Sequence, residues 1–302
     1  MTAPTHVAGP PRLRRPWKFN WTATLIVLMG LIGVGVLMYP STAAWWSQYH
    51  QSQLIGSYNQ SVLQEPYPHN EDKLAEAHAY NQALTSGALT VGEHKPTTDG
   101  SANPTFDYWH LLSEPDVPLG RILFPAAEVD LPIYHGTNDD VLLKGVGHLE
   151  GTALPVGGAD THAVLAAHRG LASATMFDHL DQVQVGDTFT VQVLGEVLTY
   201  RVVSTQVVKP EDTKTIAPQP GRDLITLVTC TPLGINTHRV LVTGERVMPT
   251  PAEEVDRALS NSDLPGFPWW AVILGTAVIG GGLLIWRSGY PPKSKLSRKT
   301  QS

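Results

Sequence analysis

The sequence predicts a mainly β domain, either an antiparallel sandwich or a barrel, that lies between two apolar segments. Short runs rich in β-branched and aromatic residues recur through the second half of the chain. Turn signals containing glycine and proline separate these runs, and helical patterns between them are short and few. The candidate strands are 120–124, 131–134, 163–167, 188–193, 197–205, 224–229 and 240–247, and the candidate short helices are 140–146 and 174–180.

Charge is distributed unevenly along the 302 residues. Residues 1–20 and 268–302 hold 9 of the 21 basic residues and no acidic residue. The stretch between them keeps 12 basic residues against all 27 acidic ones, a net charge of −15. So acidic a central region argues against a nucleic-acid partner, because phosphate backbones are bound by clustered lysine and arginine.

Two apolar segments, 21–39 and 269–286, have about the length needed to cross a bilayer. Tryptophan lies at their edges, as it does at membrane–water interfaces. The basic ends of the chain come directly before the first segment and directly after the second. The positive-inside rule then predicts that the protein resides in the cell membrane, with both termini cytoplasmic and residues 40–268 extracellular. The alternative for the first segment is a signal peptide cleaved near 41–44, but its apolar run is long enough to favour a retained anchor.

One cysteine occurs in the whole chain, and its position is informative. Cys230 ends the apolar strand pattern 224–229 and precedes a loop that contains proline and glycine, and Arg239 opens the next strand. The short loop between them predicts that the two strand ends lie side by side. A lone cysteine cannot form an intramolecular disulfide, the usual reason for cysteine outside the cytoplasm, and this favours a reactive thiol over a buried structural cysteine. An intermolecular bridge is the other alternative.

A cysteine nucleophile needs a proton-transfer partner and a stabiliser for the developing oxyanion. Of 12 histidines, His168 stands out because it ends the apolar strand pattern 163–167, as Cys230 ends its own. Arg239, at the head of a strand, suits an oxyanion or substrate-carbonyl role, and the alternative is a surface charge. His238, in the loop before Arg239, is interpreted as solvated.

The sequence 226–230, Thr-Leu-Val-Thr-Cys, followed by Arg239 resembles the TLxTC…R signature of sortases. Sortases are membrane-anchored cysteine transpeptidases of Gram-positive bacteria. Residues 154–170 resemble the histidine segment of the same family, and residues 121–137 its first core strands. The second apolar segment and the Cys-Thr-Pro sequence resemble class C, the pilus-polymerising branch. The resemblance covers about residues 119–248.

The resemblance implies an eight-stranded sortase β-barrel without a cofactor or metal. It also implies that Cys230 is the nucleophile, His168 the general acid/base and Arg239 the stabiliser of the acyl-transfer transition state. The implied substrates are pilins or other surface proteins with an LPxTG-like sorting motif. The enzyme would cleave the motif between Thr and Gly and join the acyl group to a lysine amine of the next pilin.

Class C sortases often carry a lid with an Asp-Pro-aromatic motif ahead of the barrel, and that sequence is missing here. The nearest candidate is Asp107-Tyr108-Trp109, which lacks the proline. If it is the lid, Asp107 would pair with Arg239 or the imidazolium, and Trp109 would cover the thiol. The alternative is an ordinary aromatic loop that packs on the barrel.

Two other functions remain open at this stage. One is a housekeeping sortase that anchors surface proteins to the cell wall. The other is a sorted pilin or adhesin, although residues 264–268 lack the threonine and glycine of a cleavable motif. The expected parts are a cytoplasmic basic N-terminus (1–20), a transmembrane anchor (21–39), a helical and lid-like region (41–118), the catalytic barrel (119–248), a linker (249–268), a transmembrane helix (269–286) and a cytoplasmic basic tail (287–302).

Overall fold

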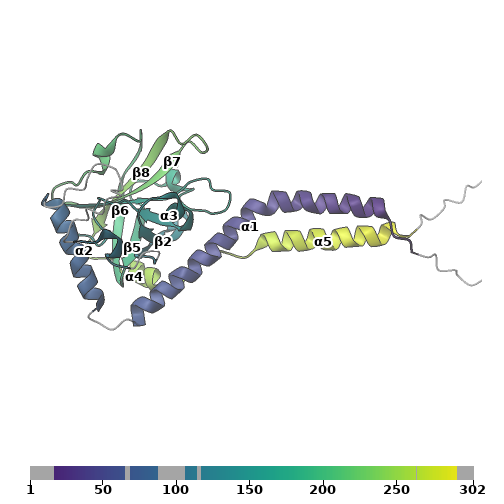
Figure 1. Cartoon of the computed structure of the whole chain (residues 1–302), viewed down its shortest axis with the longest axis horizontal. Helices are drawn as coiled ribbons and strands as arrows, with labels where there is room; N and C mark the ends of the chain where they lie inside the picture. The colour runs from purple at the N-terminus through teal and green to yellow at the C-terminus, as the bar shows by residue number, and fades with distance from the viewer. Residues whose placement is uncertain (1–16, 65–68, 88–105, 114–116, 263, 291–302) are drawn as a thin grey trace, which may run out of the picture. The chain divides into compact units, whose positions relative to one another are not determined.

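A computed structural model describes residues 17–64, 69–87, 106–113, 117–262 and 264–290. The chain forms two compact units, Pro40–Phe267 and Met1–Tyr39 with Pro268–Ser302 (Figure 1). The elements are α1 (Trp21–Gln64), α2 (His69–Thr85), η1 (Tyr108–His110), β1 (Gly120–Phe124), η2 (Pro125–Ala127), β2 (Val129–His135), α3 (Asp139–Lys144), β3 (Val146–His148), β4 (Thr161–Ala166), η3 (Leu180–Gln182), β5 (Thr188–Val193), β6 (Glu196–Val208), η4 (Thr213–Ile216), β7 (Asp223–Thr231), β8 (His238–Val247), α4 (Ala252–Leu259) and α5 (Trp269–Ser288).

The larger unit is built around a closed eight-stranded barrel with strand order β1-β2-β3-β4-β7-β8-β6-β5. The predicted barrel and its strand number are therefore confirmed. Most neighbouring strands are antiparallel, but β2–β3 and β4–β7 are parallel pairs. The β4–β7 pair matters for function, because two parallel strands end at the same edge of a sheet.

The seven predicted strands are all present. Two of them, 120–124 and 188–193, have the predicted ends, and the ends of the others differ by at most three residues. The eighth, β3, has three residues, too few for an alternation to show in the sequence. The prediction of a helix at 174–180 is wrong: the only helical element that reaches this range is η3, which begins at Leu180. The backbone of this segment instead turns back on the chain that precedes it, since the Phe177 amide donates to the His168 carbonyl at 3.0 Å.

The barrel interior is filled by large side chains from several strands. Phe189 and Tyr200 stack with their ring centroids 5.5 Å apart, and Phe124 lies 5.3 Å from Phe189. Gly244 makes this packing possible, because a Cβ there would lie 2.5 Å from the ring of Phe189. All three aromatic side chains are fully buried, and their burial supplies much of the apolar driving force for closing the barrel.

Helix α2 packs against the barrel and extends its core (Figure 1). Leu74, Ala77 and Tyr80 form its buried stripe, at the spacing of one helical face. The Asn81 amide binds both backbone groups of Leu154, donating to the carbonyl at 3.0 Å and accepting from the amide at 2.7 Å. The helical part of the region expected at 41–118 is thus present, as the second half of α1 and as α2.

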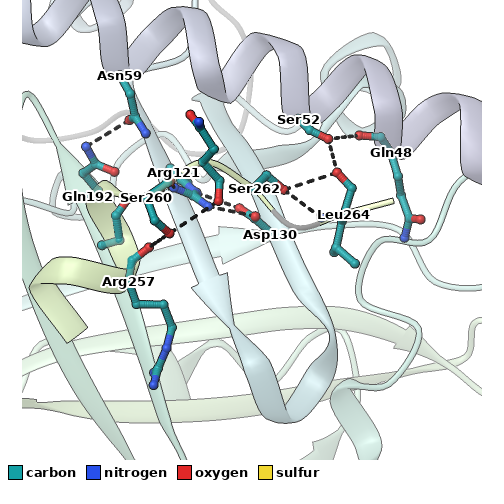
Figure 2. A network of polar contacts seen from close by, with 12 residues as sticks. Gln48, Ser52, Asn59, Arg121, Asp130, Gln192, Arg257, Ser260, Ser262 and Leu264 are labelled. Carbon is teal, nitrogen blue, oxygen red and sulfur yellow. Dashed lines mark hydrogen bonds and ion pairs between the residues drawn. The ribbon is translucent and has the colours of Figure 1, made fainter. Parts of the chain in front are cut away.

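The stretch after the barrel, expected to be a linker, contains α4 and is attached to β1 and β2 by a buried arginine. Arg121 forms a two-pronged ion pair with Asp130, at 2.6 Å through Nε and 2.8 Å through Nη2 (Figure 2). Its Nη1 donates to the carbonyls of Ala258, at 2.7 Å, and Ser260, at 2.8 Å. A guanidinium at this helix end satisfies terminal carbonyls and complements the helix dipole.

The smaller unit contains the two apolar segments, which lie side by side (Figure 1). The Trp17 indole donates to the Trp286 carbonyl at 3.0 Å, and a Cβ on Gly281 would lie 2.6 Å from the side chain of Val27. Two helices, Trp21–Val62 and Trp269–Ser288, are long and apolar enough to span a membrane. The Trp17 contact places the outer ends of the two apolar segments together.

The arginine clamp yields a first prediction. Replacing Arg121 with Met should lower the free energy of unfolding by about 3–5 kcal/mol, because Asp130 is left charged and buried without its partner. Replacing Arg257 with Met removes a partly exposed ion pair to Glu254 on α4 and should cost less than about 1 kcal/mol. Urea unfolding of both variants measures the difference. Equal losses would show that Arg121 is not the clamp.

Candidate active site

The single thiol and Arg239 lie on adjacent strands. β7 and β8 pair antiparallel with Cys230 opposite Arg239 and Thr231 opposite His238. The sequence expectation that these strand ends lie side by side is confirmed. Pairing within a sheet keeps opposed residues about 5 Å apart, so the two side chains start from neighbouring backbone positions.

His168 is brought to the same place by the parallel pairing of β4 with β7. The register sets Ala166 opposite Val228. Beyond the end of β4, the Ala167 amide donates to the Val228 carbonyl at 3.1 Å, and the Thr229 hydroxyl donates to the Ala167 carbonyl at 2.8 Å. The same register, continued two residues beyond the end of β4, predicts that His168 lies beside Cys230.

Strand alternation puts the three side chains on one face. On β4, β7 and β8 the core-facing residues include Leu165, Leu227 and Val242, all fully buried. Cys230 lies an odd number of residues from Leu227, and Arg239 lies an odd number from Val242. Both therefore project from the outer face of the barrel wall, and the alternation on β4 continued to His168 assigns it the same face.

All three candidate side chains are half-buried, so each is reachable yet held by neighbours. The thiol is free. The Arg239 Nη1 donates to the carbonyls of Asn236, at 2.9 Å, and His238, at 3.0 Å. These bonds use one nitrogen of the guanidinium. Among the described residues, no protein acceptor receives a hydrogen bond from its Nε or Nη2, which can donate to a ligand.

Further along the same outer face, a polar network joins the strands to the segment that follows β6. His162 on β4 contacts the Ala217 carbonyl at 2.9 Å and the Thr226 hydroxyl at 2.7 Å, and Thr226 contacts Thr243 at 2.8 Å. Burial lowers the pKa of His162, which favours the neutral ring. Nδ1 then donates to the carbonyl while Nε2 accepts from Thr226. Sequence reasoning missed this role, because the contact joins residues 55 positions apart.

The proposed lid residues make their described contacts elsewhere. The Asp107 carboxylate lies 2.7 Å from Nδ1 of His110 and accepts from the Trp109 amide at 3.2 Å. The Trp109 ring covers Gly136, where a Cβ would lie 2.9 Å from it. Among the described residues, no hydrogen bond or ion pair joins Asp107 to Arg239. The lid role of Asp107 and Trp109 stays a prediction.

Strand direction explains the position of Trp109. β3 is antiparallel to β4, and β2 is parallel to β3, so β2 ends at the edge opposite to that where β4 ends. Gly136 follows β2 directly and therefore lies at that opposite edge, away from His168.

The residue between the two, Tyr108, is anchored in a buried cluster. Its hydroxyl lies 2.9 Å from Nδ1 of His148 and 3.1 Å from the His148 carbonyl, and it accepts from the Gly136 amide at 3.1 Å. The His148 Nε2 contacts the Ala153 carbonyl at 2.8 Å. Complete burial lowers the pKa of His148 to about 4, and burial also lowers that of nearby His135. The cluster therefore contains neutral rings at neutral pH.

The described residues contain no group of three His, Cys, Asp or Glu side chains placed to hold a metal ion. The candidate site offers a thiol, an imidazole and a guanidinium. This combination suits nucleophilic acyl transfer, in which a thiolate attacks a carbonyl, a cation stabilises the oxyanion and an imidazole moves a proton.

Comparison with known proteins agrees with this fold. A sequence model of the sortase domain matches residues 122–247. Sortase D of Bacillus subtilis (strain 168) is 31% identical over 131 residues, which cover 42% of this chain and 63% of that protein. The chain thus spans less than two thirds of the length of this curated relative.

Solved structures match over a longer stretch. Sortase C-1 of Actinomyces oris is 47% identical with a TM-score of 0.52, and the match covers 59% of this chain and 98% of that one. Sortase C of Clostridium perfringens, solved with the C-terminal cell wall sorting motif, is 38% identical with a TM-score of 0.56 and matches 64% of this chain and 97% of that one. The chain therefore belongs to the sortase family of cysteine transpeptidases, and its structural neighbours are sortases of class C.

The buried histidines give a pH prediction. The lowered pKa means that the unfolded chain binds a proton to His148 more readily than the folded one between about pH 6.5 and 4. Its stabilising contribution, roughly 3 kcal/mol, is fully present above pH 6.5 and is lost as the pH falls towards 4. Tyr108, His135, Glu150, Asp107 and His110 are the other titratable groups in this region.

Replacing His148 with Gln should therefore flatten the dependence of unfolding free energy on pH across this window, although the variant is less stable at pH 7. Replacing the exposed His50 with Gln serves as the control and should leave the slope unchanged. Urea unfolding at pH 7 and pH 4.5 measures the slope. A His148→Gln variant with the wild-type slope would contradict the assignment of a neutral buried ring.

Proposed function

We propose that this protein is a membrane-anchored class C sortase that polymerises pilins. In this proposal it cleaves an LPxTG-like sorting motif between Thr and Gly and transfers the acyl group to a lysine amine of the next pilin. The observation that carries the proposal is the convergence of three strands. β7 and β8 pair Cys230 with Arg239, and β4, parallel to β7, leads to His168 at the same edge.

In the first half of the proposed reaction, the Cys230 thiolate attacks the carbonyl carbon of the motif threonine. Arg239 donates to the oxyanion of the tetrahedral intermediate through guanidinium nitrogens that the neighbouring carbonyls leave unused. The bond between the threonine carbonyl carbon and the glycine nitrogen then breaks, and protonated His168 gives its proton to the departing amine. A thioester on Cys230 and a neutral His168 remain.

In the second half, the lysine amine of the next pilin attacks the thioester carbonyl. His168 accepts the proton that the amine loses, and the Cys230 sulfur leaves as a thiolate, so the enzyme returns to its starting state. The product is an amide between threonine and lysine. Two observations support class C over a housekeeping enzyme. The solved structures that the chain resembles are sortases C, and a second apolar helix follows the barrel.

The membrane topology is also part of the proposal. The Lys18 amide donates to the Gly289 carbonyl at 2.9 Å, so the outer ends of the two apolar segments lie together. Arg287 and Lys18 are at these ends, and residues 1–20 and 268–302 carry no acidic residue. Basic flanks at one end of a helix pair favour a cytoplasmic location for both termini and an extracellular barrel.

The assignment of the three side chains predicts graded losses of activity. Replacing Cys230 with Ala should reduce formation of the peptide–lysine product by more than about a thousandfold. Replacing Arg239 with Lys should reduce kcat by about a hundredfold, because the ammonium cannot reproduce the guanidinium fork. His168→Gln should behave like the cysteine variant.

The assay uses the full-length protein in detergent, an LPxTG peptide and a lysine donor peptide, with product identified by mass spectrometry. His50→Gln and Arg201→Lys are matched controls at exposed positions and should retain wild-type rates. Product formation by Cys230→Ala at more than a few per cent of the wild-type rate would refute the nucleophile assignment.

The topology predicts a protection pattern in cells. Protease added outside intact cells that carry a C-terminal tag should cut within residues 40–267 and leave the tag attached to the membrane-protected fragment. Permeabilised cells are the control, in which the tag should be lost. Loss of the tag in intact cells would place the C-terminus outside and overturn the proposed topology.

A further inference from the structure

The residue directly after His168 joins the histidine-bearing loop to the strand that bears the thiol. Arg169 is nearly buried, with 10% of its side chain exposed. Its Nε donates to the Asp178 carbonyl at 3.1 Å, and its Nη2 lies 2.5 Å from a carboxylate oxygen of Asp181. Its Nη1 lies 3.5 Å from the hydroxyl of Thr231, the residue after Cys230. One guanidinium therefore touches both segments that meet at the site.

The loop that contains these partners is closed on itself. The Gly170 amide donates to a carboxylate oxygen of Asp178 at 2.7 Å, and the Phe177 amide donates to the His168 carbonyl at 3.0 Å. These bonds fix the backbone on both sides of Arg169. The loop has no regular helix to hold its shape, so its position relative to β7 depends on such individual contacts.

A second contact, next to Arg169 in the chain, also joins the loop after β4 to the region that follows Cys230. Gly170 has φ +75°, and a Cβ there would lie 2.4 Å from the side chain of Leu233 in the loop between β7 and β8. The loop after β4 therefore touches the end of β7 through Arg169 and Thr231, and the loop after β7 through Gly170 and Leu233. Glycine is needed at 170 both for the left-handed backbone and for this close approach.

Strand alternation shows how Arg169 acts without entering the reaction. Ala167 and Thr229 are core-facing, and the alternation along β7 assigns Thr231, which the Arg169 guanidinium contacts, to that same side. His168 and Cys230 project from the opposite face. The guanidinium thus holds the two segments from behind, while the reacting side chains face outward.

We infer that Arg169 is a positioning residue for the acyl transfer, which sets the separation of His168 from Cys230 by clamping the loop 168–181 to the end of β7. The inference rests on the proposed function of these two side chains. It assigns Arg169 no contact with substrate. Its action is geometric, because proton transfer between imidazole and leaving group depends on placement to within about 1 Å.

The geometry also explains why arginine suits this position better than lysine. A planar guanidinium presents donors in several fixed directions and can bond a carbonyl, a carboxylate and a hydroxyl at once. A lysine ammonium keeps the charge, yet it is a point donor that cannot span these three acceptors. A lysine substitution therefore separates the clamp from a simple effect of positive charge near the thiol.

The test compares kcat and KM of Arg169→Lys, Asp181→Asn and the double variant with a matched pair at the other end of β7. In that pair, Arg222 binds Glu245 at 3.1 Å through Nε and 2.7 Å through Nη2. Arg222→Lys and Glu245→Gln are the controls. The full-length enzyme is assayed in detergent with the LPxTG peptide and the lysine donor, and urea unfolding reports the stability of every variant.

The inference predicts that Arg169→Lys lowers kcat by about ten- to a hundredfold with KM for the sorting peptide within twofold of wild type. Asp181→Asn should lower kcat in the same direction, and the double variant should lose much less than the product of the single losses. Arg222→Lys should keep the wild-type kcat at a comparable loss of stability. A lower kcat in Arg169→Lys than in Arg222→Lys, at a comparable loss of stability, would not arise if Arg169 only stabilised the fold.

Two results would overturn the inference, and each differs from failure of the proposed function. Wild-type kcat in Arg169→Lys would show that the several contacts of the guanidinium are not needed for catalysis. Equal losses of kcat in Arg169→Lys and Arg222→Lys, following their loss of stability, would reduce Arg169 to a structural residue. If the wild-type enzyme and the Cys230→Ala variant both form no product, the proposed function fails instead.

Discussion

The parallel pairing of β4 with β7 is the constraint on which the candidate site depends. Antiparallel pairing of neighbours along the chain accounts for Cys230 and Arg239, since a short loop returns β8 beside β7. His168 is 62 residues away from Cys230 in sequence, and the parallel register of β4 with β7 predicts that the two lie close together. The Thr229 hydroxyl extends that register past the end of β4 by binding the Ala167 carbonyl. The buried Thr229 side chain thus holds the chain that leads to His168 against β7.

The surrounding structure stabilises the barrel in different ways at different places. Arg121 attaches α4 to the β1–β2 hairpin through a buried ion pair and two carbonyls, so the chain after the barrel is part of the folded unit. The Tyr108–His148 cluster closes the opposite edge with neutral groups, which explains why acid should weaken the fold. The site itself is left half-exposed, and Arg169 supplies from behind the rigidity that the loop after β4 lacks.

Most of the fold could be predicted from the sequence, because strands and turns are recognised from the periodicity and turn residues of short stretches. The strand ending at Cys230 was identifiable from its β-branched run and the loop after it, and His168 from the matching pattern on β4. Three features were beyond such signals. β3 has three residues, the expected helix at 174–180 is replaced by a loop that bonds back to His168, and the expected linker folds as α4 on Arg121. Each depends on contacts between residues distant in sequence. Asp107 and Trp109 fit the composition of a lid, but their described contacts are with His110 and Gly136.

The most direct test of the account is to trap the acyl-enzyme on the full-length protein. The enzyme is incubated with an LPxTG peptide without an amine donor, quenched in acid and digested, and the adduct is located by mass spectrometry. The account predicts one adduct on Cys230 that is sensitive to hydroxylamine and has the mass of the peptide acyl group ending at threonine. This adduct should form about a hundredfold more slowly in Arg239→Lys, and more slowly still in His168→Gln. Cleavage of the peptide between Thr and Gly with no adduct on Cys230, or with the acyl group on another residue, would contradict it.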